Sequence, residues 1–156
     1  MSVSKERIAG LDFDIIKEPW NKYSLRDGSS LKCRYALHRI LKREILKPDG
    51  SVEGKPQFAI EGQQMNAIIH TLQELRGPPA TEKYSPEELQ AAIVAEEIPY
   101  DTIAEEWNEY VAEEGTRVRV KQTVTKVSRT NKFDKAGFPV YIIESSALAE
   151  VKPPKT

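Results

Sequence analysis

At 156 residues the chain has room for one ordinary domain or for two very small ones. Apolar residues make up 39% of it and charged residues 30%, a composition far from that of disordered chains. The formal net charge is −1, which leaves no overall field that would attract nucleic acid or a membrane surface.

Cysteine content and the N-terminal sequence narrow the class further. Cys33 is the only cysteine, so an intrachain disulfide and a cysteine-based metal site are excluded. The first seven residues lack the apolar run of a signal peptide, and no stretch approaches the roughly 20 apolar residues that span a bilayer. We therefore expect a cytoplasmic protein that does not bind membranes.

An internal repeat is the most informative feature of the sequence. Both tryptophans of the chain lie within the signature Glu-x-Trp-Asn-x-Tyr, and a shift of 87 positions superimposes them with seven identities between residues 13–42 and 100–129. After a loop four residues shorter in the second segment, the match resumes at a shift of 83 positions. This ordered series predicts an internal duplication. The identical pairs are Asp14/Asp101, Ile16/Ile103, Glu18/Glu105, Trp20/Trp107, Asn21/Asn108, Tyr23/Tyr110 and Gly28/Gly115.

The first β unit is predicted over residues 13–70, after an N-terminal tail at residues 1–12. Apolar Leu31 and Cys33 alternate with charged neighbours, which is typical of a strand with one buried face. Strands are predicted over about residues 19–25, 30–42 and 56–69, and Asp27-Gly28 is a hairpin turn signal between the first two.

An acidic linker is predicted at residues 71–99. Residues 71–106 hold two basic and nine acidic residues. Ser85 is placed to cap a helix, with Pro86 at the first helical position and Glu88 completing a capping box. The sequence predicts a connecting helix over residues 86–97 that has no counterpart before the first unit.

The second β unit is predicted over residues 100–151, followed by a tail at 152–156. Taken alone, residues 101–114 resemble a helix, but the first unit has Pro19 where that helix would have its interior, at a cost of about 3 kcal/mol. We therefore predict strands at about 106–112, 117–130 and 138–151, with Glu114-Gly115 as a turn.

A break in the strand pattern recurs in both units. Leu37 is followed by apolar Ile40, and Val124 is likewise followed by Val127, so the alternation slips at the same place. This predicts a β-bulge in each long strand.

The predicted fold class is mainly β. We expect two antiparallel three-stranded units to combine into one pseudo-symmetric barrel or sandwich with one connecting α-helix, because about 50 residues alone make a marginal core. A closed barrel is favoured since it removes sheet edges. Two separate small barrels in tandem are the alternative.

The repeated signature supplies the candidate binding residues. Alternation along a strand places the Trp on one face and the Asn and Tyr on the other, so the three cannot all be buried together. A structural role as core anchors is the first interpretation, and a protein-contact role is the second. The candidates are Trp20, Asn21, Tyr23, Trp107, Asn108 and Tyr110.

Basic residues also recur at matching positions of the two units. The first interpretation is a solvated sheet face that discourages edge aggregation, and the second is a track for the phosphates of single-stranded nucleic acid. The residues are Lys32, Arg34, Arg39, Lys42, Arg119, Lys121, Lys126 and Arg129.

Catalytic and metal-binding motifs are absent from the sequence. His38 and His70 have no partner at metal-ligand spacing, and Cys33 is expected to be a small core residue. No cofactor is expected. We therefore expect a non-enzymatic module that binds a protein partner or itself. Single-stranded nucleic-acid binding is the alternative, and a hydrolase that pairs carboxylates from the two repeats is third.

Overall fold

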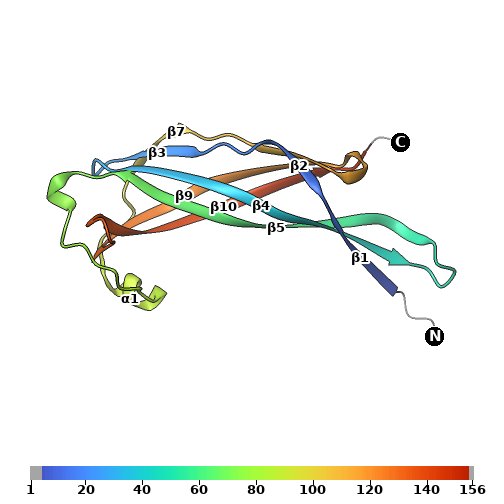
Figure 1. Ribbon diagram of the computed structural model, residues 1–156, viewed down its shortest axis with the longest axis horizontal. Coiled ribbons are helices and arrows are strands. Elements are labelled where there is room, and N and C mark those ends of the chain that lie inside the picture. The colour runs from blue at the N-terminus through green and yellow to red at the C-terminus, as the bar shows by residue number, and fades with distance from the viewer. Residues whose placement is uncertain (1–4, 155–156) are drawn as a thin grey trace.

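The computed structural model describes residues 5–154, and two five-stranded antiparallel sheets make up most of it (Figure 1). The first sheet consists of β1 (Lys5–Leu11), β3 (Asn21–Leu25), β4 (Ser30–Leu46), β5 (Val52–His70) and β7 (Tyr100–Ala104). The second consists of β2 (Phe13–Lys17), β6 (Ile93–Ala95), β8 (Asn108–Ala112), β9 (Arg117–Phe133) and β10 (Pro139–Lys152). The predicted mainly β, antiparallel class is confirmed.

One long hairpin forms the backbone of each sheet. β4 pairs with β5 and β9 pairs with β10, in both cases antiparallel. The register skips His38 in β4 and Thr125 in β9, which confirms the two predicted bulges. Each bulge changes the face on which the following apolar residues lie, so that Leu37 and Ile40 are both buried although three positions separate them.

The short strands are exchanged between the two halves of the chain. β3 pairs with β7, whereas β2 pairs with β8, so each sheet receives one strand from the segment that supplies most of the other sheet. Beyond β3, β1 lies along the same edge of β4, and β6 lies in the corresponding place along β9. Neither segment therefore completes its own sheet.

The core lies between the two sheets, where β4 crosses β9 (Figure 1). One buried cluster combines Leu37 and Ile40 of β4 with Val118 and Val120 of β9, near the start of that strand. The other cluster combines Leu31 and Cys33, near the start of β4, with Val124 and Val127, which lie farther along β9. Burial of each large aliphatic side chain contributes about 1.5–3 kcal/mol, so the face-to-face packing stabilises both sheets together.

The closed barrel of six strands that we favoured is wrong. No closed barrel is seen in residues 5–154, which form two facing sheets with ten strands. The additional strands come from segments too short or too exposed to show periodicity. Among them, residues 5–11 form β1 although the sequence placed them in the N-terminal tail. Residues 1–4 and 155–156, the outer parts of the two expected tails, lie outside the described residues.

The connecting helix is shorter than predicted. α1 (Pro86–Ala91) begins with the predicted capping box between Ser85 and Glu88, but it ends six residues before position 97. Ile93 then pairs with Thr130 in β9, because β-branched residues fit the sheet edge better than a helix. Two single 3₁₀ turns, η1 (Gln73–Leu75) and η2 (Glu113–Gly115), complete the elements. Glu114 and Gly115 both have positive φ, as a tight hairpin turn requires.

The two-cluster core predicts unequal costs for two isoleucine truncations. Ile40 is fully buried, so Ile40→Ala should lower the free energy of unfolding by about 2–5 kcal/mol. Ile8 on β1 is 60% exposed, and Ile8→Ala should change it by less than about 0.5 kcal/mol. Urea unfolding followed by circular dichroism measures both, and equal losses would contradict the assigned core.

Candidate functional site

The two signature asparagines hold the sheets together at the strand crossing. Asn21 Nδ2 donates a hydrogen bond to the backbone oxygen of Gln122 at 3.0 Å, and Asn108 Nδ2 donates to that of Tyr35 at 2.8 Å. Both asparagines are 4% exposed. The acceptors, like the donors, lie 87 positions apart, so the two bonds are reciprocal between β4 and β9. Their role is structural, since buried amides need such partners.

The two signature tyrosines make a second reciprocal set of bonds. Tyr23 Oη donates to Glu105 Oε2 at 2.7 Å, and Tyr110 Oη donates to Glu18 Oε2 at 2.6 Å. Arg34 forms an ion pair with Glu18 at 2.9 Å, as Lys121 does with Glu105 at a looser 3.8 Å. Burial, together with the hydrogen bond to a carboxylate, raises the pKa of both tyrosines.

The signature tryptophans lie on the opposite faces of their sheets, as the alternation predicted. Trp20 and Trp107 are both half-buried, while the neighbouring Asn and Tyr residues point into the core. Lys32 Nζ lies 4.2 Å from the centre of the Trp20 ring, and Arg119 Cζ lies 4.3 Å from that of Trp107. Each indole is thus covered on one side by a cation.

An open groove lies on the outer face of the first sheet, and we call it groove A. It encloses about 450 Å³ and crosses β7, β3, β4 and β5. Ile103 and Ile69 contribute exposed apolar surface, at 65% and 54% exposure. Its lining includes Trp20, Lys22, Lys32, Ile69 and Ile103.

A corresponding groove, groove B, lies on the outer face of the second sheet. It encloses about 180 Å³, and eight of its nine lining residues match those of groove A at shifts of 87 or 83 positions. The exceptions are Glu150, which has no counterpart in groove A, and Trp20, whose counterpart Trp107 does not line groove B. Ion pairs fill much of it, because Arg119 contacts Glu109 at 3.8 Å and Glu150 at 3.2 Å. Groove B is therefore smaller and internally neutralised, whereas groove A is not.

Most of the predicted nucleic-acid residues are engaged with carboxylates of the same chain. Seven of the eight form ion pairs, and only Lys32 does not within residues 5–154. Lys126 contacts Glu96 of the acidic linker at 3.1 Å. The pairs are Arg34–Glu18, Arg39–Glu61, Lys42–Glu114, Arg119–Glu150, Lys121–Glu105, Lys126–Glu96 and Arg129–Asp27.

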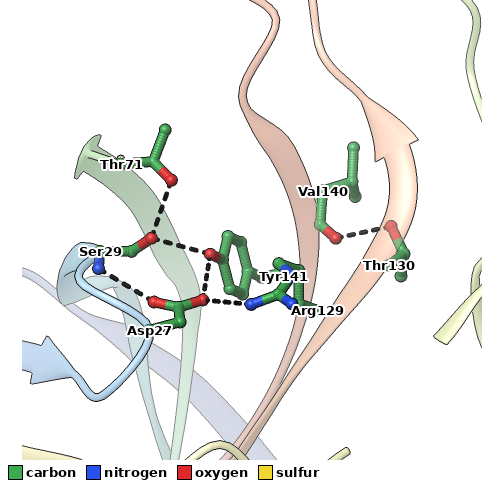
Figure 2. Close-up of polar contacts among 7 residues, drawn as sticks. All are labelled: Asp27, Ser29, Thr71, Arg129, Thr130, Val140 and Tyr141. Atoms are coloured by element: carbon green, nitrogen blue, oxygen red, sulfur yellow. Dashed lines mark hydrogen bonds and ion pairs between the residues drawn. The ribbon is translucent and has the colours of Figure 1, made fainter. Parts of the chain in front are cut away.

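A polar network around Asp27, which the sequence did not reveal, ties the β3–β4 turn to the second sheet (Figure 2). Asp27 Oδ2 accepts from Tyr141 Oη at 2.6 Å and from Arg129 at 2.9 Å, and its other oxygen accepts from the Ser29 backbone at 2.9 Å. Ser29 Oγ donates to Thr71 at 2.9 Å. These partners lie up to 114 positions away, so no local pattern could identify them.

Burial and hydrogen bonding shift the titration of this network. Burial alone would raise the pKa of Asp27, but the bonds from Tyr141, Ser29 and Arg129 outweigh it and hold the pKa below the ordinary 3.8. Burial and the Asp27 carboxylate raise the pKa of Tyr141 to about 12. Because every oxygen of Asp27 is occupied, we assign the network a structural role.

The structure places the candidate nucleophile and the repeated carboxylates. Within residues 5–154, no group of three His, Cys, Asp or Glu side chains could hold a metal ion. Cys33 is fully buried, and burial raises its pKa to about 12, which suits a core residue and not a nucleophile. The repeated Glu18 and Glu105 are each taken up by a tyrosine and a cation.

Comparison with known proteins yields no relative. No protein-family model, no curated protein and no solved structure matches the chain. Among the described residues, no helix is long and apolar enough to cross a membrane.

The Asp27 network predicts acid-dependent stability. A carboxyl whose pKa is lowered by folding stabilises the fold above its ordinary pKa, and that contribution is lost as the pH falls through the folded value. Asp27→Asn should therefore be less stable than the parent near pH 7, with a difference that shrinks below about pH 4. Urea midpoints measured between about pH 3 and 7 test this, and parallel curves for the two proteins would contradict it.

Proposed function

We propose that the chain is a non-enzymatic interaction module that binds a protein partner or another copy of itself through groove A. The observation that carries this proposal is the exposed apolar surface of Ile69 and Ile103 beside the half-buried Trp20. An aromatic anchor with aliphatic neighbours is typical of the centre of a protein interface. The site therefore includes Trp20 of the six candidates that the sequence supplied.

The remaining signature residues support the fold in this proposal. Asn21, Tyr23, Asn108 and Tyr110 are at most 4% exposed, so their side chains offer almost no surface to a partner. Trp107 lies beside groove B, where Arg119 covers it and Glu109 and Glu150 neutralise the arginine. We accordingly assign binding to the first groove and not to the second.

We also propose that the chain arose by duplication of one β unit. Support comes from the reciprocal bonds of Asn21 and Asn108 and those of Tyr23 and Tyr110, each set at positions 87 apart. Further support comes from the equal strand order of the two sheets. In this proposal the two grooves began alike and diverged in charge. A cytoplasmic location and independence from cofactors belong to the same proposal.

Single-stranded nucleic-acid binding is the second candidate, because Lys22 and Lys32 line the same groove as the Trp20 indole, which could stack on a base. It is weaker, since Lys32 already covers Trp20 and the other seven basic candidates are ion-paired. Titration with a mixed-sequence oligonucleotide at low salt separates the two functions. Tight, salt-sensitive binding would favour nucleic acid, and no binding would remove it.

The interaction proposal predicts that a charge in groove A disrupts association. Ile103→Glu should weaken self-association in sedimentation velocity, or abolish capture of a partner by the immobilised chain, because it desolvates a carboxylate in an apolar contact. Ile16→Glu is the matched control, since Ile16 occupies the corresponding place in groove B and is 59% exposed.

Two results would contradict this prediction. If the parent chain is a strict monomer and captures no protein in an Ile103-dependent manner, the proposed function is wrong. If Ile16→Glu has the same effect as Ile103→Glu, the contact does not lie in groove A.

A further inference from the structure

Groove A contains an unusual arrangement of charge. Lys22 of β3 lies directly opposite Lys32 of β4 on the outer face of the sheet. Like charges directly opposite each other on neighbouring strands destabilise a sheet. Within residues 5–154, neither ammonium group forms an ion pair with a carboxylate. The isolated chain therefore leaves two adjacent positive charges without a carboxylate partner, and Lys32 contacts only the Trp20 ring.

The corresponding positions of groove B show how the same backbone accommodates a stable pair. Glu109 of β8 lies directly opposite Arg119 of β9, and the two side chains approach to 3.8 Å. Because the strand geometry is equivalent, the difference lies in the side chains alone. Groove A thus combines positive charge with apolar surface from Ile69 and Ile103. A complementary partner surface would present carboxylates together with small apolar groups.

Such a surface exists on the linker of this chain. Pro86, Glu87, Gln90 and Ala91 line a shallow hollow on α1, which presents two small apolar side chains next to a carboxylate. Glu87 is exposed, and the exposed Glu82 lies before the helix on the same linker, in a neighbouring hollow that also includes Tyr84. The exposed Lys83 follows Glu82 directly. Neither glutamate forms an ion pair within the described residues. Glu88 is already used in the capping box.

A molecule cannot make this contact with itself. Its own α1 packs against β9 and β10, and Figure 1 places the helix on the far side of the molecule from β3 and β7. The two complementary surfaces are therefore both available to other copies. A contact between two different surfaces is heterologous, so it builds either a closed ring or an open chain of subunits.

We propose that groove A of one copy binds the linker surface at and before α1 of a second copy, with Lys22 and Lys32 paired to its Glu82 and Glu87. The inference rests on the proposed function and specifies its partner as this chain. The carboxylates relieve the repulsion between the two lysines, while Pro86 and Ala91 cover apolar surface beside Trp20.

Sedimentation velocity on the full chain tests the inference. The parent should self-associate in a concentration-dependent manner, more weakly as salt rises. Lys22→Glu combined with Lys32→Glu should weaken association more than about tenfold, since it places like charges across the contact. The control is Lys47→Glu with Lys55→Glu, which changes the net charge equally at the exposed far end of the β4–β5 hairpin and should associate like the parent.

A mixing experiment identifies the partner surface. Glu82→Lys with Glu87→Lys should also lose self-association, and mixing it with the Lys22→Glu, Lys32→Glu protein should restore a complex. If association requires Ile103 but survives both charge reversals, the proposed function stands and the inference is overturned. If the mixture stays monomeric although each variant remains folded by circular dichroism, the inference is likewise overturned. If the parent is monomeric, the inference is overturned. The proposed function then stands only if the chain captures another protein in an Ile103-dependent manner.

Discussion

The crossing of β4 over β9 is the constraint on which the rest of the structure depends. At that point two backbone carbonyls from different sheets would be buried without partners unless a side chain reached them. Asn21 and Asn108 supply the missing donors. The hydroxyls of Tyr23 and Tyr110 donate hydrogen bonds to the nearby carboxylates of Glu105 and Glu18. Because these side chains come from strands next to the crossing, they determine how the two sheets face each other.

Strand exchange follows from the same arrangement. The segments that precede each signature turn away from their own hairpin, so β2 joins the second sheet and β7 joins the first. The two halves must therefore fold together, and the buried clusters on either side of the crossing each contain residues from both. The outer faces, which carry the grooves, are the surfaces left free by this packing.

The sequence predicts the local features well and the long-range ones poorly. Strand periodicity located the long hairpins, and the matched apolar slip located bulges at His38 and Thr125, because both signals are local. The capping box located the start of α1, but its end was missed since tertiary pairing of Ile93 overrides helix continuation. Strand exchange and the short strands β1 and β6 depend on partners far along the chain, which no local pattern records.

For the candidate site, too, the sequence indicates the local features and misses the contacts between distant strands. Alternation separated Trp20 from Asn21 and Tyr23 and so anticipated which residues face outward. The exposed Ile69 and Ile103 that complete groove A come from β5, which pairs with β4, and from β7, which pairs with β3. The ion pairs that engage most basic residues were also invisible, because their acidic partners lie on other strands. Within residues 5–154, the like-charged pair of Lys22 and Lys32 forms no ion pair, and the proposed contact rests on it.

The central claim is that the repeated signature holds the fold while groove A makes the contact. A double-mutant cycle of Tyr110→Phe and Glu18→Gln, followed by urea unfolding and by sedimentation of each folded variant, tests it most directly. We expect a coupling of about 0.5–3 kcal/mol in the free energy of unfolding, with self-association unchanged. Negligible coupling together with lost association would place the function in the signature itself and contradict the account.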